Sequence, residues 1–241
     1  MKAVAAAVFA AGWLASGGRT IHAQESAFEV RLRFQVDRSI TPRRFRGVRA
    51  GVLEDEAAAI WRPYGVQLEW TDTREHDERM DGFYLDVRLE PQLDRLGRAP
   101  WGTVLGSASV QPGAPTRSPI LVSLDGTEAF LALGKARRPP AERLVRDVDL
   151  ARGLGRILAH EVGHVLLAAP RHADAGLMRA SFGVELGQLD REPFRLTCAD
   201  VDRLRTRLRA LASDPRFAQS ARHRAEDDGE PASCIVARRS R

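Results

Sequence analysis

The chain has 241 residues, 44% of them hydrophobic and 29% charged, and its formal net charge is +5. These values are typical of a soluble globular protein, and the length suits one domain with a sizeable core rather than two domains. The arginines are dispersed along the chain, without a basic run interleaved with aromatic residues. A solvated surface therefore explains the positive charge better than nucleic-acid binding does.

Residues 1–23 have the composition of a secretory signal. Lys2 supplies a positive start, residues 3–14 form an apolar run, a Gly-Gly pair breaks it, and Ala23 offers a cleavage position. The run is shorter than the roughly 20 apolar residues that span a bilayer, and no other stretch is apolar enough to do so. We therefore expect an exported protein, secreted or periplasmic, whose signal is either removed or kept as an uncleaved anchor.

The first part of the mature chain shows strand and helix patterns in turn. Apolar and polar residues alternate with a period of two in three segments that we predict to be strands: residues 28–36, 66–70 and 83–89. Residues 46–64 have apolar side chains at helical spacing and are closed by Pro63 and Gly65, which predicts a helix.

Shorter elements are predicted in the middle of the chain. Residues 120–124 are almost continuously apolar, which suits an interior strand, and residues 127–134 suit a short helix. Residues 103–110 contain glycine and small side chains. That composition fits either an irregular edge strand or an ordinary surface hairpin.

Two longer helices are predicted in the second half. The first begins near Asp147 or Asp149, where a carboxylate can cap free N–H groups, and it is apolar on most sides, so we expect it to be buried. The second covers residues 198–212, with Thr197 as its N-cap. Residues 179–196, between the two helices, have an irregular pattern.

The chain has two cysteines, Cys198 and Cys234. Export would bring them into an oxidising compartment, where one disulfide could tie the tail to the last helix; two free thiols are the alternative. Apart from such a bond, we expect the polar residues 213–241 to form a loose tail.

The sequence HEVGH, residues 160–164, lies inside the first long helix. Residues four apart share one face of an α-helix, so the imidazoles of His160 and His164 can hold one metal ion. Glu161 is then placed to take a proton from a water on that ion and to return it to a leaving amine. The alternative is a buried helix with two satisfied histidines. We favour a metal because each unpaired buried polar group costs about 1–3 kcal/mol.

A third ligand is expected downstream, because catalytic zinc usually has three protein ligands and one open position. We place His172 first, since a Gly-Leu-Met turn at residues 176–178 follows it closely. Asp174, Glu185 and Glu192 are the alternatives, because carboxylates are also sound zinc ligands.

HEVGH followed by His172 and Met178 resembles the metzincin clan of zinc metallopeptidases, whose pattern is H-E-x-x-H-x-x-G-x-x-H and then a methionine turn. The chain departs from this pattern in two ways: its third histidine comes two residues late, and Leu167 replaces the glycine. We interpret the late histidine as the result of a helix that continues to residues 168–169 before Pro170 ends it.

The resemblance implies roles for the site residues. In the clan the metal is Zn²⁺, so His160, His164 and His172 would hold it, Glu161 would be the general base and then the general acid, and Met178 would pack beneath the ion. The edge strand above the metal binds the substrate as an added strand, a role that would fall to residues 103–110. The segment after the methionine shapes the main specificity pocket. Four apolar residues there could line that pocket or belong to the core: Phe182, Val184, Leu186 and Phe194.

We therefore predict an α/β fold with one zincin-like domain over residues 24–212, a twisted mixed sheet, an active-site helix and a C-terminal helix. The predicted function is that of an exported, monomeric zinc metalloendopeptidase acting on peptides or proteins, with no nucleic-acid partner and no membrane contact beyond an uncleaved anchor. Three alternatives stay open: a zincin with a carboxylate as third ligand, a non-catalytic zinc-binding protein of the same fold, and a basic protein that binds nucleic acid or acidic polymers.

Overall fold

The structure is a computed structural model that describes residues 27–46, 48–71, 82–93, 104–110, 119–131, 140–222 and 234–235. The predicted signal, residues 1–23, lies outside these ranges. None of the helices within the described ranges combines the length and the apolar character needed to cross a bilayer.

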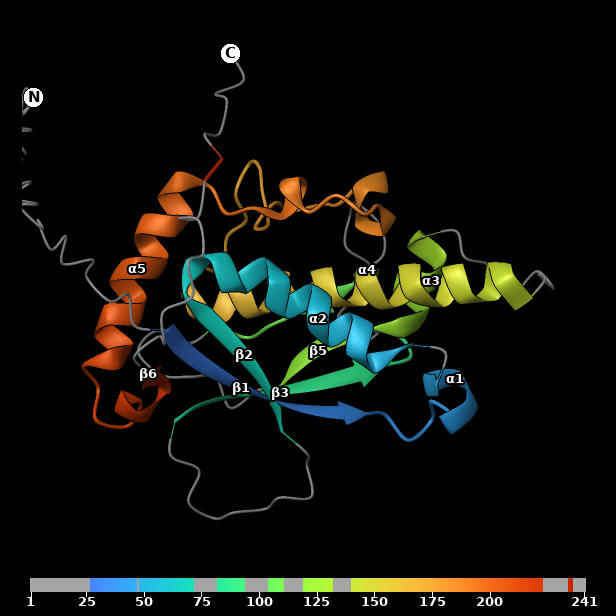
Figure 1. Ribbon diagram of the computed structural model, residues 1–241, viewed down its shortest axis with the longest axis horizontal. Coiled ribbons are helices and arrows are strands. Elements are labelled where there is room, and N and C mark those ends of the chain that lie inside the picture. Colours follow the sequence, from blue (N-terminus) through green and yellow to red (C-terminus); the bar gives the residue numbers. More distant parts are fainter. Residues whose placement is uncertain are drawn as a thin grey trace, which may run out of the picture.

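A mixed sheet forms one layer of the molecule (Figure 1). Its strands are β1 (Ala27–Val36), β2 (Val66–Thr71), β3 (Phe83–Glu90), β4 (Gly106–Ser107), β5 (Ile120–Ser123) and β6 (Ala221–Arg222). The order is β2-β1-β3-β5-β4, and β6 pairs with β1. The pairs β1–β2, β1–β3 and β3–β5 are parallel, whereas β4 runs antiparallel to β5 at the edge of the sheet. The predicted strands and the interior position of β5 are thus confirmed, and the segment around Gly106 is the edge strand rather than a surface hairpin.

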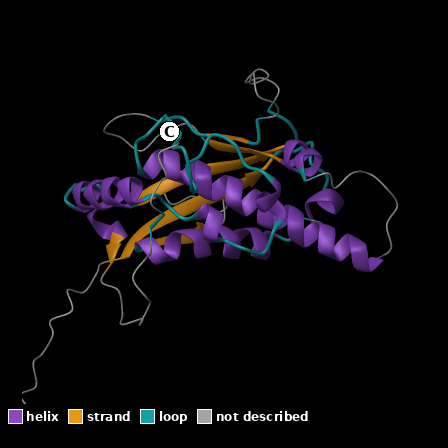
Figure 2. Cartoon of the chain, turned by 90° about the horizontal axis from the view of Figure 1, so that it is seen from above, coloured by secondary structure: helices purple, strands orange, loops and turns teal. Residues whose placement is uncertain are grey.

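The helices are α1 (Pro42–Arg46), α2 (Ala50–Trp61), α3 (Leu124–Phe130), α4 (Pro140–Leu166) and α5 (Cys198–Ala212). The 3-10 turns are η1 (Arg62–Tyr64), η3 (Val184–Gly187), η4 (Glu192–Phe194) and η5 (Ala218–Ser220). Helices α2 and α4 lie side by side over one face of the sheet (Figures 1 and 2). The α/β class, the long buried helix and the C-terminal helix are therefore as predicted.

Side-chain alternation explains why the sheet has one covered face. Phe28, Val30 and Leu32 of β1 point toward the helices and are buried. The intervening arginines lie on the other face, where Arg33 pairs with Asp86 of the neighbouring strand β3 at 2.6 Å. A period of two in sequence thus becomes one apolar and one charged surface.

Three helices start at residues other than the predicted ones. Helix α4 begins at Pro140, earlier than Asp147, because proline is well suited to the first turn of a helix. The helix predicted over residues 46–64 begins only at Ala50, as α2, because Arg49 adopts a left-handed conformation with φ 53° and separates it from α1. Helix α3 begins at Leu124, before the predicted Thr127, because the Ser123 side chain accepts a hydrogen bond from the Gly126 N–H and caps the helix.

The chain after α5 packs onto the domain up to Arg222, beyond the boundary at Ala212 that the sequence predicts. The Phe217 ring lies 5.5 Å from the Phe83 ring, and the Ser220 hydroxyl accepts a hydrogen bond from the Phe83 N–H at 2.7 Å. Residues 213–222 are therefore part of the folded domain and not of a loose tail.

Cys198 and Cys234 form a disulfide, which resolves the choice between a bond and two free thiols. Ile235 lies beside Thr197 in a short parallel bridge. Its N–H donates to the Leu196 carbonyl at 3.1 Å, and its carbonyl accepts from the Cys198 N–H at 3.2 Å. The disulfide and the bridge together attach this late segment to the chain just before α5.

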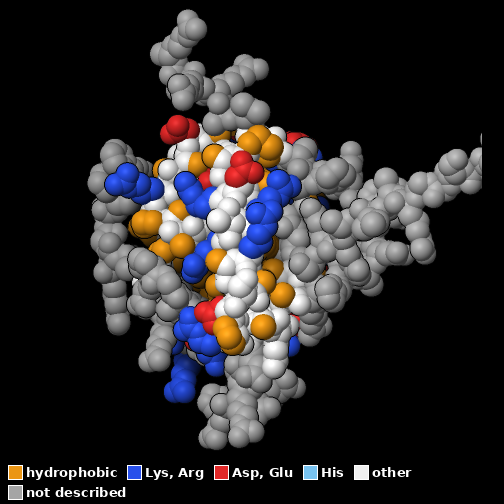
Figure 3. All heavy atoms as spheres, turned by 90° about the vertical axis from the view of Figure 1, so that its left-hand side faces the viewer, with side chains coloured by type: hydrophobic (Ala, Val, Ile, Leu, Met, Phe, Trp, Pro, Cys, Tyr) orange, Lys and Arg blue, Asp and Glu red, His pale blue; other side chains and the backbone are white. Residues whose placement is uncertain are grey.

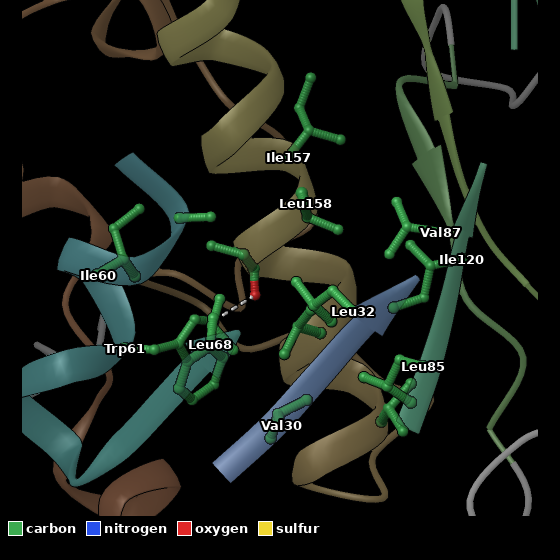
Figure 4. Packing of buried hydrophobic residues seen from close by; sticks show 14 of the residues in the cluster. Val30, Leu32, Ile60, Trp61, Leu68, Leu85, Val87, Ile120, Ile157 and Leu158 are labelled. Atoms are coloured by element: carbon green, nitrogen blue, oxygen red, sulfur yellow. Dashed lines mark hydrogen bonds between the residues drawn. The ribbon is translucent and has the colours of Figure 1, made fainter. Parts of the chain in front are cut away.

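The core between helices and sheet is closely packed (Figure 4). Trp61 of α2 is buried there, and its indole N–H donates to the Ala159 carbonyl of α4 at 3.1 Å. The two helices lie close together at Gly155, where an added Cβ would lie 2.6 Å from the Leu53 carbonyl oxygen. Only glycine allows this approach, which fixes the position of α4 one turn before HEVGH.

We predict opposite effects for two glycine-to-alanine substitutions in these helices. Gly155→Ala should lower the free energy of unfolding by about 1–3 kcal/mol, because the new methyl group pushes against the α2 backbone. Gly51→Ala is the control: no atom lies within 4 Å of its added Cβ. Because alanine is the better helix former, we expect it to raise the same free energy by about 0.5–1 kcal/mol. Urea unfolding measures both, and a Gly155→Ala protein as stable as the wild type would contradict the close approach.

Candidate metal centre

Helix α4 brings His160 and His164 together. Both side chains are buried, and their ring centroids lie 4.7 Å apart. The helix ends at Leu166, earlier than the predicted residues 168–169, and Ala168 turns the chain with φ 47°. The turn brings the exposed His172 back, so that its ring centroid lies 4.9 Å from that of His164.

Three ring nitrogens of these histidines converge on one point. Nε2 of His164 lies 3.0 Å from Nε2 of His160 and 3.3 Å from Nε2 of His172. Three nitrogens that bind one tetrahedral ion at about 2.0–2.1 Å lie about 3.3 Å apart, so the observed spacing fits a shared metal.

The opposite ring nitrogens determine which atoms face the centre. Nδ1 of His160 lies 2.7 Å from the Leu177 carbonyl oxygen, and Nδ1 of His164 lies 2.7 Å from that of Ala169. A carbonyl only accepts, so each Nδ1 must carry the proton and donate it. In the neutral ring Nε2 then carries a lone pair. Two lone pairs 3.0 Å apart repel each other unless a cation lies between them.

Burial keeps these imidazoles in the neutral form that binds metals. It lowers the pKa of His160 to about 3, and it also lowers the pKa of His164 and of His172. Because the buried pair is closed off on the core side while His172 is exposed, the centre is open to solvent on the side of the third histidine. The donor set thus fits an imidazole-binding ion such as zinc with a free coordination position.

Glu161 belongs to helix α4, and its side chain lies against the edge strand β4. Its side chain is buried, and this burial raises its pKa to about 8. A Cβ added to Gly106 of β4 would lie 2.6 Å from Glu161 Oε1, so the edge strand passes directly over the carboxylate. A side chain at this position in the strand would displace Glu161, and only glycine leaves room for it.

The methionine turn, residues 176–178, packs against the helix that carries His160 and His164. Met178 is buried, and a Cβ added to Gly163 would collide with its sulfur and lie 3.3 Å from the Trp61 ring. The Leu177 N–H donates to the Arg195 carbonyl at 2.9 Å. Gly163 of HEVGH therefore makes room for Met178 against helix α4.

Four apolar residues after the methionine turn were predicted either to line a pocket or to belong to the core, and their burial distinguishes the two cases. Leu186 and Phe194 are buried core residues, whereas Val184 is 82% exposed. The Phe182 ring lies 5.3 Å from the His160 ring and 5.6 Å from the Phe194 ring. Of these four residues, Phe182 is the one that forms a ring contact with a histidine of the centre.

The carboxylates considered as third ligands lie elsewhere. Glu185 pairs with Arg179, and Glu192 pairs with Arg195. In the described part of the chain, the group whose ligand atoms all lie within 4.8 Å of one another consists of His160, His164 and His172 and does not include Asp174.

Sequence reasoning did not identify two kinds of contributor to this site. The backbone carbonyls of Leu177 and Ala169 orient the imidazoles, and no residue type signals such a role. Gly106 and Gly163 provide space beside Glu161 and Met178. A glycine inside a predicted helix or strand is the one signal that could have found them.

No family model matches the sequence, and no curated protein does so either. Among solved structures, the fold is similar to archaemetzincin from Methanopyrus kandleri, with a TM-score of 0.40 and 16% identity over 76% of this chain and 96% of that chain. It is also similar to a zinc-dependent peptidase from Methanocorpusculum labreanum, with a TM-score of 0.44 and 16% identity over 74% of this chain and 99% of that chain.

The geometry predicts which downstream residue matters for metal binding. His172→Ala removes one of three converging nitrogens and should weaken Zn²⁺ binding by about 100-fold or more, because a site with two nitrogens loses a full coordination bond. Asp174→Ala, two residues away, is the control and should bind Zn²⁺ as the wild type does. Competition with a chromophoric chelator measures both affinities. Equal affinity of His172→Ala and wild type would overturn the assignment of the third ligand.

Proposed function

We propose that the protein is a zinc metallopeptidase in which His160, His164 and His172 hold the metal and Glu161 is the general base. The convergence of three imidazole nitrogens next to a buried glutamate on the same helix carries this proposal. When bound, Zn²⁺ lowers the pKa of a water molecule to about 7 and polarises a scissile carbonyl.

The protein's own part in the reaction is the movement of a proton. Glu161 takes the proton of the attacking water on its carboxylate and delivers it to the nitrogen of the leaving amine, so that the carboxylate is regenerated. Burial raises the pKa of this carboxyl, so it takes up a proton more readily than an exposed glutamate does. Burial also keeps bulk water away from the transfer.

We also propose that β4 holds the substrate. It is one of the two edge strands of the described sheet, and it passes over Glu161 at Gly106. An extended peptide paired with that edge would bring one of its peptide bonds beside the carboxylate and the three imidazoles. An edge strand accepts the middle of a long chain as readily as its end, so we propose cleavage of internal bonds.

Export is the last element of the proposal. Residues 1–23 have the features of a secretory signal, and the Cys198–Cys234 disulfide suits an oxidising compartment. We place the peptidase in the periplasm or outside the cell. The surface seen in Figure 3, where basic side chains are interspersed with acidic and apolar ones, fits a soluble enzyme better than a binder of nucleic acid.

The decisive test compares Glu161→Gln with the wild type. The substitution keeps the size of the side chain but removes the base, so we expect hydrolysis of a mixed peptide library to fall by about 10²–10⁴-fold while Zn²⁺ affinity stays unchanged. Glu192→Gln is the matched control, because Glu192 is an exposed glutamate paired with Arg195, and it should keep wild-type activity.

Two outcomes would overturn the mechanism. A Glu161→Gln protein as active as the wild type would exclude the glutamate as the base. A zinc-loaded wild-type protein that hydrolyses no peptide would instead support a metal-binding protein without turnover.

A further inference from the structure

Arg156 is a fully buried arginine one turn before His160 on α4, and the reaction proposed above does not use it. Its side chain is 0% exposed, and its Nε donates to Glu56 Oε1 of α2 at 2.7 Å. The Glu56 side chain is only 4% exposed. A charge pair removed from water to this degree costs more than a surface pair and needs further hydrogen bonds to be tolerated.

The two terminal nitrogens of the guanidinium donate these further hydrogen bonds to backbone carbonyls of residues 185–190. Nη1 donates to the carbonyls of Glu185 and Leu186 at 2.5 and 3.3 Å, and Nη2 donates to the carbonyl of Asp190 at 3.1 Å. The planar fork of an arginine can reach such a set of acceptors, whereas the compact ammonium of a lysine cannot. The segment of residues 184–191 is thereby attached to α4.

Two phenylalanine rings connect Arg156 to the metal centre. The guanidinium lies 4.3 Å from the Phe194 ring centroid. Phe194 lies 5.6 Å from Phe182, and Phe182 lies 5.3 Å from His160. Arg156 thus contacts the neighbours of Phe182 through backbone carbonyls and through the Phe194 ring. Arg179, whose guanidinium lies 5.1 Å from the Phe182 ring centroid, contacts Phe182 directly.

A second arginine closes the same network from the surface. Arg191 is half-exposed and donates to Glu56 Oε2 at 2.7 and 2.9 Å. Glu56 therefore receives one guanidinium on each oxygen, one from α4 and one from the end of the attached segment. This arrangement holds both ends of residues 184–191 to the same pair of helices.

We infer that Arg156, held by Glu56, is a positioning residue that fixes residues 182–191, which we call the wall, beside His160 and so determines how substrate side chains are received. The role of the wall in binding substrate rests on the proposed peptidase function. The attachment of the wall to α4 rests on the hydrogen bonds alone. Arg156 does not orient the histidines themselves, because the carbonyls of Leu177 and Ala169 do so.

Two variants of the full-length, zinc-loaded protein test this role. Arg156→Lys keeps the charge beside Glu56 but loses the fork that reaches the three carbonyls. The double variant Glu56→Leu with Arg156→Met replaces the buried pair by apolar side chains of similar size, which leaves no buried charge unpaired and protects folding. Arg191 also loses Glu56 in this variant, but its half-exposed guanidinium can turn to water. The double variant Glu128→Leu with Arg146→Met is the control, since this pair also joins α4 to another helix, at 3.1 Å, but none of its hydrogen bonds reaches residues 184–191.

We expect hydrogen exchange of the backbone amides of residues 184–191 to become about tenfold faster in both Arg156 variants, with exchange in α5 unchanged. For a panel of peptides we expect KM to rise about tenfold while kcat stays within about twofold, because the wall binds substrate without taking part in the proton transfer. Zn²⁺ affinity should not change. The control variant should leave all of these values at the wild-type level.

Wild-type exchange in residues 184–191 of the Arg156 variants would overturn the inference. A fall in kcat and in Zn²⁺ affinity with KM unchanged would also overturn it, because Arg156 would then act on the metal centre and not on the wall. If the wild-type protein hydrolyses no peptide, the proposed function fails, and the exchange measurement still decides whether Arg156 holds the wall.

Discussion

The hydrogen bond between His160 Nδ1 and the Leu177 carbonyl joins the two parts of the chain that make this site. One partner belongs to a helix buried in the core and the other to the methionine turn, seventeen residues later. The bond fixes the proton on Nδ1, so the lone pair of Nε2 faces the centre. His164 is held in the same way by Ala169, and the position of each imidazole is thus determined by a backbone carbonyl outside the helix.

Helix α4 can carry so many polar groups in the core because each is matched by a particular neighbour. Trp61 bonds to the helix just before the histidines, Gly155 lets α2 approach, and Gly163 admits the sulfur of Met178. Arg156 and Glu56 are buried as a pair together with three carbonyls. The helix is therefore held on several sides, which is what a preorganised site requires, since a loosely held ligand set would lose metal affinity.

Local patterns predicted much of this architecture. The alternation in residues 28–36 and 83–89 indicates strands because a half-buried strand imposes a period of two on its own residues. The spacing of His160 and His164 predicts their shared face for a similar reason. The downstream His172 could be proposed from its order in the chain, and the structure brings it to the same point.

What the sequence could not supply depends on contacts between distant segments. Arg156 and Glu56 are 100 residues apart, and nothing near either residue indicates the other. The start of α2 differs from the predicted one because Arg49 is left-handed, which apolar spacing does not reveal. The start of α4 differs because Pro140 begins the helix before the carboxylates that were expected to cap it. The pairing of Cys198 with Cys234 stayed open because two cysteines carry no information about compartment or distance.

The short bridge at Ile235 has a consequence for how the disulfide acts on the site. Leu177 is held by Arg195, and the adjoining Leu196 is held by Ile235, next to the disulfide. The supports of His160 thus come from successively later segments, although the histidines themselves lie on one helix that forms from local contacts. The Cys198–Cys234 disulfide thus lies at the far end of a series of backbone contacts that begins at the methionine turn. Oxidation of the two cysteines would therefore act on the orientation of the His160 imidazole only through this series of backbone contacts.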